Sequence, residues 1–224
     1  MILIDKRPEP GRLLAYRKQR HAAYDNMPRD VKAEVKRSLV EEQGGLCAYC
    51  MSRLPPVDEI DDGDTRVTIE HWSPQRPADG AEADDRLDYR NMLAVCDGNR
   101  GSGRSGSMTC DAAKGNRRIT VNPLRKETLA DIYYTRDGEI HSGNAAVETD
   151  LTETLNLNSS EVSLPQKRQR ALQTLHRFIQ NRYGTRGVTR SALQKLLARY
   201  ESPQKTKEPY VGILIWWLND RMRR

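Results

Sequence analysis

The chain has 224 residues, of which 37% are hydrophobic and 30% are charged, and its net charge is +6. This length allows one domain or two small ones around a modest core. No run reaches the roughly 18 apolar residues of a membrane-spanning helix, and the first residues lack the apolar stretch of a signal peptide. We therefore expect a cytoplasmic protein with no membrane partner, whose cysteines stay reduced.

Charge is distributed unevenly along the chain. Residues 151–224 hold 14 Lys and Arg against 5 Asp and Glu, whereas residues 46–116 hold 8 against 13. A basic region beside an acidic one suits a protein that brings a polyanion such as DNA to a metal site. A solvated helical surface explains the same charges equally well, because charge runs are common on helices.

Hydrophobic periodicity and β-branched residues predict several elements in the first half of the chain. They are a short strand at residues 2–4, a helix at 29–43, strands at 66–71 and 92–96, and a short helix that begins at Cys110 and ends at Gly115. The two glycines after residue 43 end the long helix. A segment rich in Gly, Ser and Arg, residues 97–109, separates the second strand from the short helix.

The second half of the chain is predicted to be mainly helical. Asp137-Gly138 lies between the β-prone segments Ile132-Tyr-Tyr-Thr and Glu139-Ile-His and favours a hairpin with a type I′ turn, which we interpret as structural. Apolar residues at helical spacing predict helices around residues 171–179, 188–197 and 209–218. The chain then divides into an N-terminal helical segment (1–45), a central core (46–125), the hairpin (126–150) and a basic helical region (151–224).

All four cysteines lie within the central core, at Cys47, Cys50, Cys96 and Cys110. Cys-x-x-Cys is a tight turn that offers two thiolates, and the glycine-rich segment lets the other two fold back towards it. This pattern predicts a tetrahedral structural Zn²⁺ site. Buried free thiols remain an alternative, whereas a redox pair is disfavoured because no thioredoxin-like strand and helix surround it.

Glu70 and His71 stand at the end of the first predicted strand of the core. An imidazole can take a proton from water at neutral pH, and a neighbouring carboxylate can bind Mg²⁺. Adjacent side chains of a strand point to opposite faces, so both residues serve one site only if the strand ends there. Trp72-Ser73-Pro74 indicates such an end, although a surface salt bridge is the more common meaning of a lone Glu-His pair.

The motifs together resemble the HNH endonuclease family. The matching segments are Cys47-x-x-Cys50, Ile69-Glu70-His71-Trp72-x-Pro74, Leu87-x-Tyr89-x-Asn91-Met92-Leu93, Cys96, and Cys110-Asp111-x-x-Lys114-Gly115. The sequence is most similar to the nuclease subunit of Septu and retron anti-phage systems, the PtuB-like proteins. The resemblance implies an α+β, mostly helical fold, in which a ββα-metal (HNH) core with a four-cysteine zinc site lies between N-terminal and C-terminal helices.

The same resemblance implies roles for four residues. His71 would be the general base that activates water, and Glu70 would bind the catalytic Mg²⁺ or Mn²⁺. Asn91 would brace the connection between the strands and orient His71. Asp111 stands where the family often has His or Asn, and as a hard oxygen ligand it would also bind the catalytic ion.

Three basic residues near the last cysteine are candidates for binding substrate phosphates. Lys114 would hold a phosphate or pair with an acidic neighbour. Arg117 and Arg118 flank the same helix and would contact the nucleic-acid backbone.

The resemblance favours a DNA endonuclease that acts as the effector of an anti-phage defence system. The resemblance also implies control by an ABC/SMC-like ATPase partner (PtuA-like). Any nucleotide dependence would come from that partner, since this chain has no G-x-x-x-x-G-K-[ST] phosphate loop of its own. Two other functions stay open. One is a zinc-stabilised nucleic-acid-binding module without catalysis, and the other is an HNH nuclease that cleaves RNA or tRNA.

Overall fold

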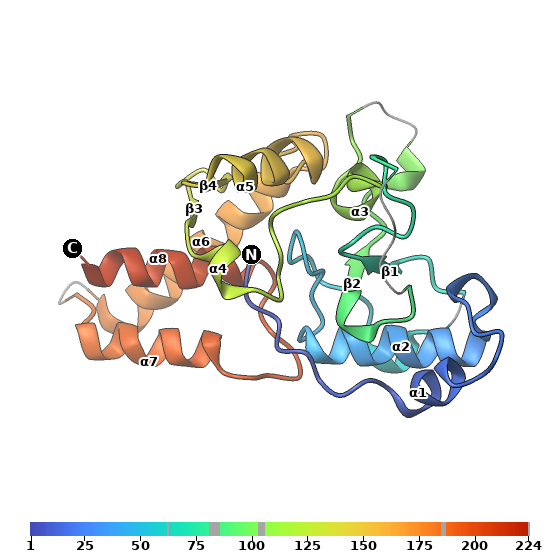
Figure 1. Cartoon of the computed structure of the whole chain (residues 1–224). Helices are drawn as coiled ribbons and strands as arrows, with labels where there is room; N and C mark the ends of the chain where they lie inside the picture. Colours follow the sequence, from blue (N-terminus) through green and yellow to red (C-terminus); the bar gives the residue numbers. More distant parts are fainter. Residues whose placement is uncertain (62, 81–85, 103–105, 185–186, 224) are drawn as a thin grey trace.

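A computed structural model describes residues 1–61, 63–80, 86–102, 106–184 and 187–223. The fold is α+β, with many helices and two small antiparallel sheets. Figure 1 shows two groups of elements: α1, α2, α3, β1 and β2 lie on one side, and β3, β4 and helices α4 to α8 lie on the other. Among the described residues, no helix combines the length and apolar character that crossing a membrane requires.

The first group starts with two helices, α1 (Gly11–Arg17) and α2 (Arg29–Glu42), each preceded by a proline. The apolar stripe of α2 is buried, with Val35 and Leu39 fully shielded from solvent. The prediction of a short strand at residues 2–4 is wrong, because this segment has no strand pairing. Instead, the N–H of Ile4 donates to the carbonyl of Pro123 at 2.8 Å.

The central sheet pairs β1 (Val67–His71) with β2 (Met92–Cys96) in antiparallel register, with His71 opposite Met92. Both strands agree with the predicted ranges within one residue, because their β-branched and apolar residues are buried against α2. Helix α3 (Cys110–Lys114) follows, and Gly115 ends it with a φ of 56°. Contacts between α3 and β2 then place the short helix beside this sheet.

The remaining short elements connect these parts. Single 3₁₀ turns occur at Tyr24–Asn26, Val57–Glu59, Tyr89–Asn91 and Arg100–Ser102, and α4 spans Lys126–Leu129. Helix α5 (Ala145–Thr149) continues into a π-helical turn (Asp150–Thr154), which the periodicity did not predict. The Asp150 carboxylate holds this turn in place by accepting from the N–H groups of Thr120 and Val121, at 2.5 and 2.9 Å.

The hairpin forms as expected between β3 (Ile132–Tyr134) and β4 (Ile140–Ser142), but its turn differs from the prediction. Thr135 and Glu139 also pair, at 3.0 Å, so three residues connect the strands and Gly138 has a φ of 89°. A three-residue connection that ends in a left-handed glycine is the common alternative to a type I′ turn. The same glycine lies against α6, where an added Cβ would meet the Pro165 carbonyl oxygen at 2.0 Å.

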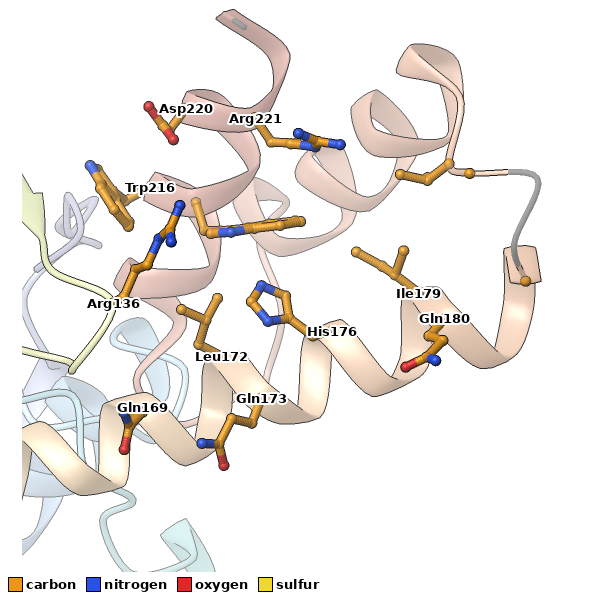
Figure 2. Close-up of a pocket in the computed structure, with 14 residues that line it drawn as sticks. Arg136, Gln169, Leu172, Gln173, His176, Ile179, Gln180, Trp216, Asp220 and Arg221 are labelled. Atoms are coloured by element: carbon orange, nitrogen blue, oxygen red, sulfur yellow. The ribbon is translucent and has the colours of Figure 1, made fainter.

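Three helices complete the second group: α6 (Leu164–Tyr183), α7 (Arg190–Glu201) and α8 (Val211–Arg223). Leu172 and Leu175 bury the predicted stripe of α6, whereas Phe178, expected on the same face, is 44% exposed. A cavity of about 590 Å³ lies between α6 and α8 and is lined by His176, Trp216 and Trp217 (Figure 2). Both tryptophans are only half-buried there.

The two groups meet at the cysteine-bearing turn. The N–H of Tyr210, just before α8, donates to the Met51 carbonyl at 2.9 Å, and the N–H of Cys110 donates to the Leu155 carbonyl at 2.9 Å. At Gly212 the start of α8 comes so close that an added Cβ would lie 2.9 Å from the terminal methyl of Met51. The four-cysteine region belongs to the first group of elements and also forms its contact with the second group.

Candidate functional site

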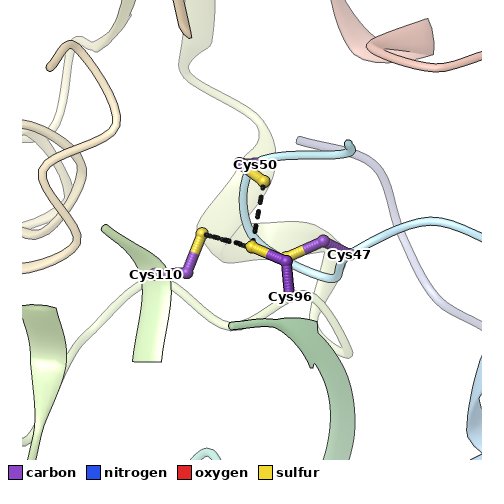
Figure 3. A group of neighbouring side chains, drawn as sticks. All are labelled: Cys47, Cys50, Cys96 and Cys110. Carbon is purple, nitrogen blue, oxygen red and sulfur yellow. Dashed lines mark hydrogen bonds between the residues drawn. The ribbon is translucent and has the colours of Figure 1, made fainter. Parts of the chain in front are cut away.

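The four cysteines converge to a single point. The Sγ atoms of Cys47 and Cys110 are 3.8 Å apart, those of Cys50 and Cys96 are 3.8 Å apart, and those of Cys96 and Cys110 are 3.7 Å apart (Figure 3). A tetrahedron of sulfurs around zinc, with Zn–S bonds of about 2.3 Å, has edges of about 3.8 Å. A disulfide would need about 2.05 Å, so all four thiols are free.

Local structure explains how distant parts of the chain supply these ligands. Residues 46–53 fold back on themselves through the bridge of Leu46 with Arg53, and the N–H of Met51 donates to the Cys47 carbonyl at 3.0 Å. Cys96 is the last residue of β2, and Cys110 is the first residue of α3. The end of a strand, the start of a helix and a tight turn thus point their thiols to one place.

The protonation of the cluster reflects its crowding. Burial raises the pKa of Cys47, and hydrogen bonds to the other thiols raise the pKa of Cys110. The pKa of Cys50 is lowered instead, because the same neighbours donate hydrogen bonds to its sulfur. Four close, buried sulfurs of this kind could hold a metal ion such as zinc.

A second cavity, of about 400 Å³, lies beside the cluster, at the end of β1. Its lining residues include Glu70, His71, Asp111 and Lys114. Because β1 ends at His71, the adjacent side chains of Glu70 and His71 both reach this cavity, as the sequence-based argument required. This cavity, called the His71 cavity below, therefore combines an imidazole, the carboxyl groups of Asp25, Glu70 and Asp111, the Lys114 ammonium group and the Arg76 guanidinium group.

Glu70 is buried, at 4% exposure, and its Oε1 accepts two hydrogen bonds. The Tyr49 hydroxyl donates at 2.9 Å and the Lys114 ammonium donates at 2.6 Å. Lys114 is itself 1% exposed and also donates to the His71 carbonyl at 2.9 Å. Lys114 thus has the second of its two expected roles, that of partner to an acidic neighbour.

Asp111 is a further acidic residue of the His71 cavity. Its carboxylate is hydrogen-bonded to Glu70 and forms an ion pair with Arg100. Burial and the charge of Asp111 raise the pKa of Glu70 to about 8, and the nearby Lys114 only partly opposes them. Burial also acts to raise the pKa of Asp111, but the hydrogen bonds from Glu70 and Arg100 outweigh it and lower the pKa.

The hydrogen bonds of His71 determine which ring nitrogen is basic. Nε2 lies 2.8 Å from the Arg86 carbonyl oxygen, which can only accept, so Nε2 carries the proton. The lone pair is then on Nδ1, which lies 2.8 Å from the Gln75 side-chain nitrogen. Burial lowers the pKa of His71, and the Tyr24 ring packs edge-on at 4.6 Å. His71 is thus a neutral, oriented imidazole at neutral pH.

Asn91 holds the turn that follows β1. Its side-chain oxygen accepts from the Ser73 N–H at 2.7 Å, and its side-chain nitrogen donates to the Ser73 carbonyl at 2.9 Å. Its main-chain carbonyl accepts from the Trp72 N–H at 3.0 Å. These bonds fix the chain immediately after His71, and no direct bond from Asn91 to the imidazole is among them.

The two arginines expected to bind phosphates are engaged elsewhere. Arg117 donates to the carbonyls of Ala113 and Thr154, at 2.6 and 3.0 Å, and so connects α3 to the π-helical turn. Arg118 pairs with Asp79 at 3.1 Å on the surface. Neither residue lines the His71 cavity.

The carboxyl groups offer a limited set of ligands to a divalent ion. Within the described ranges, the four cysteines are the only group of three or more His, Cys, Asp or Glu side chains with converging ligand atoms. Mg²⁺ nevertheless commonly uses one or two carboxylates together with water and substrate phosphates. Glu70 and Asp111 fit that pattern, with Lys114 and Arg100 as competing cations.

Several residues around the His71 cavity were not expected from the sequence. Tyr49 lies between the first two cysteines, and Tyr24, Gln75 and Arg86 lie in loops or turns without a periodic pattern. No motif marks them, because each acts through a single hydrogen bond or ring contact that depends on the folded loops. Comparison with protein-family models and with curated proteins gives no match to this chain.

Proposed function

We propose that the protein is a metal-dependent endonuclease of the HNH type that cleaves DNA phosphodiester bonds, with a structural Zn²⁺ ion on its four cysteines. One observation carries this proposal. A neutral His71, with its lone pair on a defined nitrogen, shares a cavity of about 400 Å³ with the carboxyl groups of Glu70 and Asp111. An oriented base beside hard oxygen ligands is what metal-assisted hydrolysis of a phosphodiester needs.

The proposed chemistry begins at Nδ1 of His71. A water molecule that replaces the Gln75 amide next to this nitrogen would give up its proton there as it attacks phosphorus. The bond from phosphorus to the leaving ester oxygen would break in the same step, and that oxygen would take a proton from solvent. The Arg86 carbonyl, which accepts from Nε2–H, would stabilise the imidazolium that forms. A divalent ion held by Glu70 and Asp111 would supply charge stabilisation for the phosphate oxygens. Asn91 would contribute by fixing the turn that follows the base.

The resemblance to nucleases of anti-phage systems extends the proposal to biological context. The effector would then act under the control of a separate ATPase of the ABC/SMC-like class, and any nucleotide dependence would come from that ATPase because this sequence has no G-x-x-x-x-G-K-[ST] loop. Co-expression and co-purification with the ATPase encoded next to it, if there is one, would test this part separately from the chemistry.

A second candidate function is supported by a specific observation. The two carboxyl groups proposed to hold the divalent ion already have protein cations as partners, Lys114 for Glu70 and Arg100 for Asp111. This arrangement is also what a zinc-stabilised nucleic-acid-binding module would have if it needed no catalytic ion. Such a module would bind DNA equally well with or without Mg²⁺ and would never produce nicks.

Plasmid nicking decides between the two functions. We expect the wild-type protein to nick supercoiled DNA with Mg²⁺ or Mn²⁺, and His71→Ala to be about 10²–10⁴-fold slower, the usual contribution of a general base. His21→Ala changes an exposed histidine outside the cavity and is the matched control. Wild-type nicking by His71→Ala would contradict the assignment, and parallel RNA and tRNA substrates would reveal an RNA-cleaving enzyme.

A further inference from the structure

Arg168, on α6, is the largest fully buried side chain of the described residues, with 0% exposure. Its guanidinium group donates to the main-chain carbonyls of Gly138 and Leu157, at 3.0 and 2.8 Å, and more weakly to the Asn158 side chain at 3.4 Å. Its Nε–H has no hydrogen-bond partner. These acceptors are neutral, so they satisfy donors without compensating the charge.

A buried guanidinium normally has a carboxylate partner, because an unpaired buried charge is strongly destabilising. Among the described residues, Arg168 has no ion pair with Asp or Glu. The groups that favour its charged form are instead Tyr134, Tyr210 and two cysteines of the cluster, Cys50 and Cys110. Burial lowers the pKa of Arg168, and these groups oppose that effect.

Metal binding would provide the missing negative charge. Four thiolates around a Zn²⁺ ion leave two net negative charges, buried in the same region of the protein. We propose that Arg168 is the counter-charge of this zinc–tetrathiolate site, and that the pairing couples zinc binding to the packing of α6. The inference rests on the proposed structural zinc, but it is independent of any chemistry at His71.

The main-chain contacts around Arg168 support the coupling. Its acceptor Leu157 lies two residues after Leu155, whose carbonyl accepts from the N–H of Cys110. Its other acceptor, Gly138, belongs to the hairpin loop that packs directly on α6. One short segment therefore contacts both the last zinc ligand and the buried cation.

Zinc affinity of the full chain, measured by competition with a chelating dye, tests the proposal. Arg168→Met keeps most of the side-chain length but removes the charge, and we expect zinc to bind about 10–100-fold more weakly, as for other groups that support metal ligands. Arg168→Lys keeps the charge but loses the forked hydrogen bonds, so we expect a lower melting temperature with near-wild-type zinc affinity.

The matched control is Arg117→Met, which also removes an arginine that donates to main-chain carbonyls, including that of Thr154. We expect it to lower the melting temperature while zinc affinity stays at the wild-type level. Equal zinc affinity in Arg168→Met and the wild type would overturn the inference. A 10–100-fold loss of zinc affinity in Arg168→Lys would also overturn it. If Arg168→Met does not fold, the measurement on Arg168→Lys decides. Purified protein without zinc would overturn the zinc proposal itself.

Discussion

The cysteine cluster and the neighbouring His71 cavity both gather acidic groups in a buried place, but they differ in how the charge is balanced. Four thiols of like character meet at 3.7–3.8 Å, and none of them forms an ion pair with a cationic side chain at contact distance among the described residues. In the His71 cavity, by contrast, Glu70 has Lys114 and Asp111 has Arg100.

Under the proposed function, this difference separates a site that would need its metal from a site that would only accept one. Ionised thiolates at these distances repel each other unless a cation lies between them, so the cluster is fully stabilised only when it is loaded. The His71 cavity is stable without a metal because protein cations take its place. We therefore expect tight, permanent metal at the cysteines and weaker, exchangeable metal at the carboxylates.

The largest expected effect comes from removing a zinc ligand. Cys110→Ser should abolish cooperative folding, because structural zinc contributes about 10–16 kcal/mol of apparent binding free energy and the net stability of a domain is about 5–15 kcal/mol. Zinc content and thermal unfolding by circular dichroism measure this. Met108→Ser, at an exposed site two residues earlier, is the control, and a wild-type melting temperature for Cys110→Ser would contradict the comparison.

The next effect concerns the internal balance of the His71 cavity. Above pH 8, where Glu70 is ionised, Glu70→Gln leaves the buried ammonium group of Lys114 without its carboxylate and should reduce the free energy of unfolding by about 3–5 kcal/mol. The double variant Glu70→Gln/Lys114→Met removes both charges and should recover part of this loss. Urea unfolding of the four proteins in the cycle measures the coupling, and strictly additive losses would show that the two groups do not compensate each other.

Asn91 should have a smaller effect. Asn91→Ala leaves the N–H and C=O groups of buried Ser73 without their side-chain partner, which costs about 1–3 kcal/mol. Asn91→Asp can still accept from the N–H but cannot donate to the carbonyl, so it should fall between the wild type and Asn91→Ala. A rank order with Asp below Ala, by urea unfolding at neutral pH, would argue against the role of Asn91 in holding this turn.

The effect that is smallest within any one pH unit is a dependence of stability on pH. The pKa of Glu70 rises from an ordinary 4.5 to about 8 on folding, so between these values the folded state binds one more proton than the unfolded state. Its contribution to the free energy of unfolding therefore decreases as pH rises through this window, by at most about 1.4 kcal/mol per pH unit. Subtracting the profile of the Glu70→Gln/Lys114→Met variant isolates this slope, and a slope of the opposite sign would refute it.

Local sequence patterns were sufficient to predict the main elements of the core. The β-branched segment before Trp72 and the apolar segment ending at Cys96 are strands, and residues 29–42 are a helix. Cysteine spacing predicted that four thiols would converge, because Cys-x-x-Cys is a tight turn and the glycine-rich segment allows the other two cysteines to fold back towards it. The roles proposed for His71, Glu70, Asn91 and Asp111 stay predictions until nicking is measured.

The remaining features depend on tertiary contacts that periodicity does not encode. Arg168 counts as one more basic surface residue in the composition of the C-terminal region, although it lies four residues from both Leu164 and Leu172 on the buried stripe of α6. Lys114 likewise lies one helical turn after buried Cys110. In both cases the sequence indicated burial only through a charged residue spaced like the buried residues of its helix. The hydrogen-bond partners seen in the fold explain why that charge is buried.

Gly212 shows how narrowly the two halves of the molecule fit together. A single added carbon at this position would come within 2.6 Å of the Tyr134 hydroxyl oxygen and 2.9 Å of the Met51 methyl group. Even the Cβ of alanine would clash at this position and force apart the first turn of α8 and the loop that carries Cys47 and Cys50. We expect saturation mutagenesis here to return almost only glycine among well-folded clones, although the residue touches neither a metal nor the cavity at His71.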